Sequence, residues 1–464
     1  MKGMKKLWML GLISLMATTA ISEESYAYRI YLKEKGDAGY ALDQPEKFLS
    51  KEALQRRAHE GIAVDSTDLP ISPSVIERIA QMGFRPVTQS RWFATVVVMT
   101  DDSTKINRLN GLDEIDSVKW IWQGDDALPE EEMPFARKEK IATPDPITKS
   151  YYGYAEKQTT MIDGERLHHA GYKGEGMTIA IFDAGFRNVD RLMVFDSLKL
   201  KGTRNFVFPQ LTVFRADDHG TKALSCLAAN APGIMVGTAP EASYWLIKSE
   251  DSRSEYPIEE DYWTAAAEFA DSVGVDLISS SLGYYKYDDD RLSPTQNDLD
   301  GKSAFITRAA EMAAKKGMLV ISSAGNEGHG DWNKITFPGD AGDILTVAAV
   351  DEKKKPSTFS SEGFIKRYAT KPDVTALGTD CTVIDPSGII RLANGTSFST
   401  PTVAGMAACL KQALPSLTVP QLIRLIQQSS SRYKHPDRAV GYGIPDFYKA
   451  YQNGLKDEKR NDRY

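Results

Sequence analysis

The sequence predicts an α/β protein in which a mainly parallel sheet carries helices on both faces, preceded by a small α+β domain. Two observations predict the sheet. From about residue 151 to 450, strand-like and helix-like segments alternate, and the strands are short, nearly continuous apolar runs. Alternating elements build βαβ units, and a strand buried on both faces lacks polar alternation. In such a sheet, ligands bind beyond the carboxyl ends of the strands.

The N-terminus has the pattern of a signal peptide. Three lysines precede an apolar run at 7–20, with small residues at 18–20 and 25–27. A charged start, a short apolar stretch and a small-residue cleavage zone are typical of export signals, and we place this one at 1–27. The run is short for a membrane span, and no later stretch is long enough. We therefore expect an exported protein, secreted or periplasmic, without a membrane span.

Residues 28–125 predict the small α+β domain. Ser50 stands where it would cap the first helix, and Gly111 stops the last one. The expected elements are strands at 28–32, 93–98 and 117–122 and helices at 50–58, 74–82 and 103–110. Residues 126–150 follow as a linker, because they are rich in Glu, Pro and Lys and have no apolar periodicity. Its basic residues, Arg137, Lys138 and Lys140, are expected to be accessible to proteolysis.

The large domain is expected at 151–450. Its strands are predicted at 177–182, 242–247, 275–279, 318–322 and 344–350, and its helices at 223–229, 258–272, 304–316 and 419–429. A further helix begins near residue 397. Residues 451–464 are almost entirely polar, which predicts a frayed tail.

Composition excludes several classes of protein. A content of 42% hydrophobic residues is ordinary for a soluble globular chain of 464 residues. A net charge of -7 without a long basic run argues against nucleic-acid binding. Cys226, Cys381 and Cys409 are too few and too scattered for a metal cluster or a disulfide scaffold. One pair could form a disulfide, but the apolar helical runs around Cys226 and Cys409 favour buried thiols.

One stretch places a serine at the start of a helix of small apolar residues: Asn394-Gly395-Thr396-Ser397-Phe398-Ser399-Thr400-Pro401. The unpaired N–H groups and the dipole of a helix start favour negative charge beside Ser397. Pro401 is expected to be tolerated because the first turn has no N–H bonds to lose. The alternative is a capped, buried helix with an ordinary serine. The choice depends on whether the chain supplies a base.

Three other positions carry polar groups at strand ends or helix starts. Asp183 ends the 177–182 strand, His219 opens a helix after two aspartates, and a Gly-rich segment at 322–328 contains Asn326. Taken singly, each has a structural interpretation: a turn-forming Asp, a structural His and a Gly-rich turn. Together they place Asp, His and Ser in chain order at sites of one α/β sheet, which is one of the known arrangements of a Ser-His-Asp triad.

With these residues the chain resembles a subtilisin-like serine protease (subtilase, peptidase family S8) over about residues 151–450. The matching blocks are Ile181-Phe182-Asp183-Ala184-Gly185, His219-Gly220-Thr221, Ser280-Ser281-Leu282-Gly283, Ala324-Gly325-Asn326-Glu327-Gly328, Gly395-Thr396-Ser397-Phe398-Ser399-Thr400-Pro401 and Gly441-Tyr442-Gly443-Ile444-Pro445-Asp446. The resemblance implies a subtilisin-like fold and an endopeptidase that cleaves protein or peptide substrates.

The resemblance also implies roles for single residues. Ser397 would attack the scissile carbonyl, His219 would be the general base and then the general acid, and Asp183 would orient the imidazole. Asn326 and the Ser397 N–H would stabilise the oxyanion. The walls of the substrate cleft, where an extended peptide adds as a strand, would include Ser281, Leu282, Gly283, Ala324 and Gly325.

Two segments depart from the family pattern. Ala184 replaces a Ser or Thr that is common after the catalytic Asp, and that hydroxyl lies outside the chemistry. The 284–301 segment, with Asp288-Asp289-Asp290, is longer than in compact subtilisins. It offers oxygen ligands for calcium, although a solvated acidic loop is the favoured interpretation. Structural calcium therefore stays an open alternative without assigned ligands, and the chemistry is expected to need no cofactor.

By the same resemblance, residues 28–125 would be a propeptide that assists folding and then occupies the cleft; an unrelated accessory domain is the alternative. We expect a monomeric precursor whose partners are its substrates and its own propeptide, matured by cutting within 123–150. A catalytically silent subtilase fold acting as a binding or scaffold protein is the rival hypothesis. An acid peptidase of the sedolisin type is disfavoured, because the base position is His219 rather than a Glu.

Overall fold

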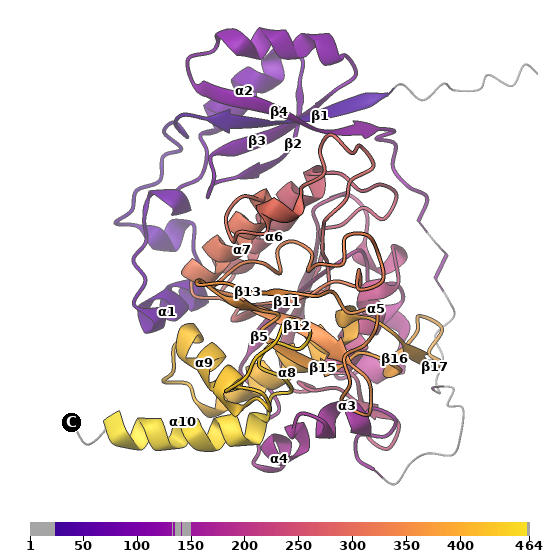
Figure 1. Ribbon diagram of the computed structural model, residues 1–464. Coiled ribbons are helices and arrows are strands. Elements are labelled where there is room, and N and C mark those ends of the chain that lie inside the picture. The colour runs from indigo at the N-terminus through magenta and orange to yellow at the C-terminus, as the bar shows by residue number, and fades with distance from the viewer. Residues whose placement is uncertain (1–23, 132, 135–140, 142–149, 462–464) are drawn as a thin grey trace, which may run out of the picture.

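The structure is a computed structural model that describes residues 24–131, 133–134, 141 and 150–461. Figure 1 shows a small N-terminal domain lying across one side of a larger domain, above helices α6 and α7. Most of the predicted signal segment and most of the predicted linker, with Arg137, Lys138 and Lys140, lie outside the described residues.

The large domain contains a seven-stranded sheet whose neighbouring strands are all parallel, in the order β15-β12-β11-β10-β5-β9-β6. The predicted fold class is confirmed. The strands are β5 (Thr178–Asp183), β6 (Lys199–Asn205), β9 (Ser243–Lys248), β10 (Leu277–Ser280), β11 (Leu319–Ser323), β12 (Leu345–Val350) and β15 (Val374–Leu377). Three two-stranded pairs add β7 (Asn230–Ala231) with β8 (Met235–Val236), β13 (Phe364–Ile365) with β14 (Thr370–Lys371), and β16 (Cys381–Ile384) with β17 (Ile390–Ala393).

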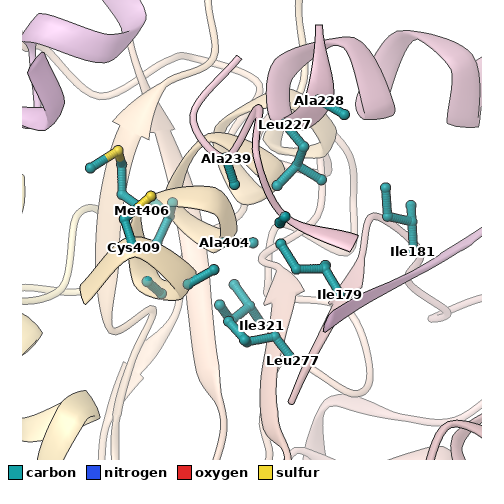
Figure 2. Packing of buried hydrophobic residues seen from close by; sticks show 14 of the residues in the cluster. Ile179, Ile181, Leu227, Ala228, Ala239, Leu277, Ile321, Ala404, Met406 and Cys409 are labelled. Carbon is teal, nitrogen blue, oxygen red and sulfur yellow. The ribbon is translucent and has the colours of Figure 1, made fainter. Parts of the chain in front are cut away.

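Helices cover both faces of this sheet, because alternate strand residues point to opposite sides. In β5, Ile179 and Ile181 pack with α5 and α8, whereas Ala180 and Phe182 pack with α6 and α7. Figure 2 shows the first of these layers, in which strand side chains meet Ala404 of α8 and its neighbours. The helices are α3 (Glu156–Thr160), α4 (Gly164–His169), α5 (His219–Ala228), α6 (Ile258–Ser272), α7 (Phe305–Lys315), α8 (Thr396–Ala413), α9 (Val419–Ser429) and α10 (Phe447–Asn461).

The N-terminal domain is an antiparallel sheet in the order β2-β3-β1-β4 with two α-helices. The face formed by Val96 and Val98 packs on helix α2, and the opposite face, with Val97 and Met99, packs on the large domain around Tyr262. This sheet is therefore covered on both sides. Its elements are β1 (Ser25–Leu32), α1 (Lys51–Glu60), α2 (Pro73–Gln81), β2 (Arg85–Ser90), β3 (Thr95–Thr100) and β4 (Ile115–Gly124).

Helix α1 lies away from the N-terminal sheet, beside the large domain and close to α9, as Figure 1 shows. It begins as predicted, because the Ser50 side chain accepts a hydrogen bond of 3.1 Å from the N–H of Ala53. At its other end, Glu60 accepts the N–H of Val419 at 3.0 Å and so caps α9 of the large domain.

Two predicted features differ in the structure, and one strand was not predicted. Residues 451–461 continue helix α10 instead of forming a frayed tail, because Tyr451 and Leu455 pack on the core at helical spacing. The 103–110 segment is a 3₁₀ helix over Ser103–Gly111. Strand β2 was not predicted, because its sequence Arg-Pro-Val-Thr-Gln-Ser lacks apolar alternation and it lies at the sheet edge.

Candidate active site

Asp183 and His219 are brought into contact by the close approach of two backbone segments. Asp183 is the fully buried last residue of β5, and His219 is the first residue of α5. The His219 Nδ1 atom lies 2.9 and 3.0 Å from the two carboxylate oxygens of Asp183. A Cβ atom at Gly220 would stand 2.4 Å from the Gly185 carbonyl oxygen, so only glycine permits this approach.

The charge of Asp183 controls the basicity of His219. Burial alone would lower the imidazole pKa, but the Asp183 charge and hydrogen bond outweigh it, and Glu250 and Asp217 add to the effect. The pKa of His219 is thereby raised to about 9. Because Nδ1 faces Asp183, Nε2 is the ring nitrogen that remains to exchange a proton with another group.

Ser397 is the second residue of α8, and its side chain is almost fully buried. Its Oγ makes a long hydrogen bond of 3.5 Å to the Ser281 carbonyl oxygen. The neighbouring Phe398 ring packs on the His219 ring with centroids 5.9 Å apart, which places the start of α8 beside the imidazole.

Pro401 has a different role from the one predicted. It is the sixth residue of α8 and not part of the first turn, so its missing N–H leaves the Ser397 carbonyl without its helical partner. The Ser281 hydroxyl donates to that carbonyl oxygen instead, at 2.9 Å. The segment after β10 is thereby fixed directly to the backbone of Ser397.

Asn326 is oriented by Thr396. Its Oδ1 accepts hydrogen bonds from the Thr396 N–H at 2.9 Å and from the Thr396 Oγ at 3.1 Å. With the oxygen occupied, the amide NH₂ group of this exposed side chain is left to donate. The N–H of Ser397 also has no carbonyl to bond within the helix, because it belongs to the first turn.

The predicted cleft residues form two adjacent segments at the same edge of the sheet. Ser281, Leu282 and Gly283 follow β10, while Ala324 and Gly325 follow its parallel neighbour β11. The Ser323 hydroxyl donates to the Leu282 carbonyl at 3.3 Å. Both glycines face Thr336, since a Cβ at Gly283 or Gly325 would lie 2.1 or 2.7 Å from its side chain.

Sequence reasoning missed a set of acidic residues beside this site. Glu250 follows β9, and its charge acts on His219 and Asp183; Glu255 and Glu259 lie near it. The only signal was the acidic composition of 250–261, which is ordinarily typical of a solvated helix start. Lys248, at the end of β9, was missed as well; its ammonium group donates to the carbonyl oxygens of Ala184 and Glu250.

The residues present do not fit a calcium ion in the 284–301 segment. Asp288 accepts the N–H of Glu255 at 3.1 Å, and Asp289 pairs with Arg291 at 2.6 Å. No group of three or more His, Cys, Asp or Glu side chains is arranged for a metal within the described residues. Cys226, Cys381 and Cys409 are all buried free thiols.

The family model described as Subtilase family matches residues 174–443. The chain belongs to the subtilase family. A second model, described as the Peptidase S8 propeptide domain of Bacteroidota, matches residues 27–133 and so covers the N-terminal domain of this subtilase.

Curated relatives of this subtilase include bacterial subtilisins. It is 30% identical to Subtilisin DY of Bacillus licheniformis over 268 residues, covering 56% of this chain and 86% of that protein. It is 28% identical to Subtilisin E of Bacillus subtilis (strain 168) over 313 residues, covering 66% and 74%. These matches and the family identify a subtilisin-like serine endopeptidase with an N-terminal propeptide domain.

Solved structures show the same fold at lower identity. The MycP3 protease from the type VII (ESX-3) secretion system matches with a TM-score of 0.53 and 18% identity, over 69% of this chain and 97% of that one. MycP1 with its N-terminal propeptide removed matches with a TM-score of 0.51 and 21% identity, over 64% and 96%. None of the described helices is long and apolar enough to cross a membrane.

Proposed function

We propose that this subtilase hydrolyses peptide bonds with Asp183, His219 and Ser397 as its catalytic triad. The observation that carries the proposal is the contact of His219 Nδ1 with both oxygens of the buried Asp183 carboxylate, beside the start of α8. This contact fixes the tautomer in which Nε2 is the base. Nε2 takes the proton of the Ser397 hydroxyl while Oγ forms a bond to the scissile carbonyl carbon.

The resulting oxyanion is stabilised by the Asn326 amide and the Ser397 N–H. When the tetrahedral intermediate collapses, the C–N bond breaks and His219 returns its proton to the leaving amine, which leaves an acyl-Ser397 ester. Water then repeats the cycle with the same base and releases the acid product. The hydrogen bonds from Thr396 support this role, because they orient Asn326 before substrate arrives.

The segments at 281–283 and 324–325 are proposed as the cleft walls that bind the extended substrate through backbone hydrogen bonds. The bond from Ser281 to the Ser397 carbonyl supports this assignment, because it joins a wall to the nucleophile. No cofactor takes part in these steps.

We also propose that the chain is exported as a precursor and cuts itself in the 123–150 linker. The propeptide domain and the subtilisin relatives support this order of events. Strand β1 begins at Ser25, and Ala27 is fully buried beside Met99, so cutting at 25–27 would remove strand residues. Signal cleavage near residues 18–20 would keep the strand intact.

Replacement Ser397→Ala tests the function. The variant should accumulate as a folded, full-length precursor after expression alone, while the wild-type chain is processed; normal maturation of the purified variant would contradict autoprocessing. The rival hypothesis of a catalytically silent, binding subtilase fold predicts that wild-type protein cleaves no peptide even after its propeptide is removed.

A further inference from the structure

The propeptide domain contacts the large domain at two separate places. Its sheet packs on α6, and Arg29 binds the buried Asp261 there. Helix α1 makes the second contact, away from the sheet and close to α9, as Figure 1 shows. We call this second contact the α1 anchor and define it by Ser50, Arg56, Arg57 and Glu60.

The α1 anchor joins three segments of the large domain that are far apart in the sequence. At the end of α6, the Ser50 N–H donates to the Ser272 carbonyl oxygen at 2.8 Å. At the end of α7, the Arg56 guanidinium donates to the Lys316 carbonyl oxygen at 3.3 Å. At the start of α9, Glu60 accepts the N–H of the first helical residue at 3.0 Å. Helix α1 therefore holds the ends of three helices together.

Two glycines allow α1 to lie directly against the large domain. Gly274 follows α6 and Gly317 follows α7. A Cβ atom at Gly274 would stand 2.3 Å from the Cβ of Glu52, and one at Gly317 would stand 3.0 Å from the Cγ of Glu60. The surface at these two positions leaves no room for a side chain while α1 is docked.

Asp271 of α6 obtains its counter-charges from the propeptide domain. Its carboxylate is fully buried and accepts hydrogen bonds from Arg56 and, at 2.6 Å, from Arg57. Arg91 lies 3.6 Å away. All three arginines belong to the propeptide domain, and among the described residues they are the only cations that form a salt bridge with Asp271.

Two buried lysines of the large domain are paired in the same way. Lys316 is 2% exposed, and its ammonium group lies 3.0 Å from the Asp68 carboxylate and donates to the Thr67 hydroxyl at 2.7 Å. Lys411 is 6% exposed and lies 3.7 Å from the Glu60 carboxylate. Charges of both signs on the large domain thus meet complementary charges of the propeptide domain, which is the pattern of a specific interface.

Cutting the linker removes none of these contacts. The ion pairs use residues 29–91 of the propeptide domain, whereas the expected cut lies at 123–150. Release requires both docking places to open together, because a contact that remains holds the other at a high effective concentration. Separation would also uncover the apolar cluster that Val207, Ile258 and Tyr262 form with the propeptide sheet.

The docked domain leaves the backbone of the proposed cleft walls unused. No hydrogen bond joins the described residues 24–124 to the segments 281–283 and 324–325. The chain after β4 runs along another part of the large domain, where Arg253 donates to the Ala127 carbonyl oxygen at 2.9 Å. Docking therefore does not compete for the hydrogen-bonding groups that a substrate would use.

We propose that the propeptide domain is retained after the linker is cut and serves as a permanent second subunit of the active enzyme, held by the α1 anchor. The partner that fits this surface is thus the N-terminal part of the same chain. An inhibitor that only occupies the cleft needs no contact at the far ends of α6 and α7. This inference rests on the proposed proteolytic function and on maturation in the linker.

Size-exclusion chromatography of the processed wild-type enzyme tests the proposal without a mutation. Each fraction would be assayed for cleavage of a quenched peptide and, by intact mass, for both chains. The two chains should elute together in equal amounts with the peptide-cleaving activity, even after dilution to about 10 nM, where only a tight complex stays together. Activity that elutes with the large domain alone would overturn the proposal.

A second arm of the experiment separates retention from catalysis. In the Ser397→Ala precursor, residues 135–140 would be replaced by the recognition site of an unrelated site-specific protease, and that protease would cut the linker. The two chains should again elute together. Their separation would overturn the inference and leave the proposed proteolysis untouched. Co-elution in a protein whose wild-type form cleaves no peptide would support retention and contradict only the proposed function.

Variants then assign retention to the α1 anchor. Arg56→Met removes a guanidinium whose hydrogen bonds all go to the large domain, to Asp271 and to nearby backbone carbonyl oxygens. In the Ser397→Ala protein with a cut linker, it should raise the dissociation constant of the two chains by about 10²-fold or more. Lys51→Met is the matched control, because Lys51 is exposed on the same helix, and the dissociation constant should change little.

Glu60→Gln is a milder test for the case in which Arg56→Met prevents folding. It removes the charge that pairs with Lys411 and keeps the size of the side chain, so the dissociation constant should rise about tenfold. Circular dichroism of the uncut variants checks that they are folded. An unchanged dissociation constant in both Arg56→Met and Glu60→Gln would overturn the assignment to the α1 anchor.

Discussion

Helix α6 carries acidic residues toward two different surroundings. On the side of the propeptide domain, Arg29 binds Asp261 through two hydrogen bonds of 2.7 and 2.6 Å and also contacts Glu260. Further along the helix, Arg57 binds Asp271 at 2.6 Å. Glu259, by contrast, forms no salt bridge with a described lysine or arginine and accepts the N–H of Asp251 at 2.8 Å. Neighbouring carboxyl groups of one helix therefore differ in whether an arginine of the propeptide domain pairs with them.

The difference distinguishes carboxylates that hold the propeptide domain from one that is held by the large domain itself. A buried carboxylate is tolerated when an arginine accompanies it, because pairing offsets much of the desolvation cost. Glu268 shows the same principle with neutral donors: it accepts hydrogen bonds from Ser90 and from the N–H groups of Arg91 and Trp92. The propeptide domain thus supplies hydrogen-bond partners to Asp261, Glu268 and Asp271 of α6.

Substituting Asp183, the proposed catalytic carboxylate, should produce the largest effect. Asp183→Asn should lower kcat about 10⁴-fold with little change in propeptide docking, because the amide no longer enforces the correct His219 tautomer. The measurement is single-turnover cleavage by enzyme that was matured by added wild-type protease. A loss below tenfold would show that Asp183 belongs with the structural carboxylates.

Removing a cation from the docking side should destabilise the precursor strongly. Arg29→Met leaves Asp261 buried and uncompensated, which typically costs about 3–5 kcal/mol. Urea unfolding of the Ser397→Ala precursor, with and without this change, measures the loss. Arg78→Met is the matched control in the same domain, since the Arg78–Glu114 pair is largely exposed, and it should change little.

The pH dependence of kcat/KM should shift when the charge of Glu250 is removed. The proposed mechanism requires neutral His219, so kcat/KM should rise with pH through the pKa of about 9. Glu250 raises this pKa, and Glu250→Gln should therefore move the rise to lower pH. Peptides without charge are the right substrates for this profile. A shift to higher pH would contradict the placement of Glu250 beside His219.

Removing the uncharged Ser281 hydroxyl should have the smallest effect of these substitutions. Ser281→Ala removes the hydroxyl that serves the Ser397 carbonyl, and the free energy of unfolding should fall by about 1 kcal/mol. Thermal unfolding of the inactive Ser397→Ala precursor carrying this change would report it. If the free energy of unfolding falls as much as it does for Arg29→Met, a neutral hydrogen bond would contribute as much as the buried Arg29–Asp261 ion pair, which would contradict this account.

The sequence allowed the site to be placed because strand ends are recognisable and parallel strands end at one edge. Asp183, after an apolar run, and Asn326, in a Gly-rich segment, could be located in this way. The acidic residues beside His219 could not be located, since Glu250, Glu255 and Glu259 have the composition of a solvated helix start, and only tertiary packing buries one of them. The same limit applies to α10, where Leu455 among charged residues decided the outcome.

Covalent labelling of the mature enzyme with a fluorophosphonate tests the central claim most directly. Intact-mass and peptide analysis should find one adduct, on Ser397, that is absent from Ser397→Ala and forms far more slowly in His219→Ala. Labelling at another serine, or no labelling of folded mature protein that is free of its propeptide, would contradict the claim that the cleft side of this fold holds the Asp183-His219-Ser397 triad.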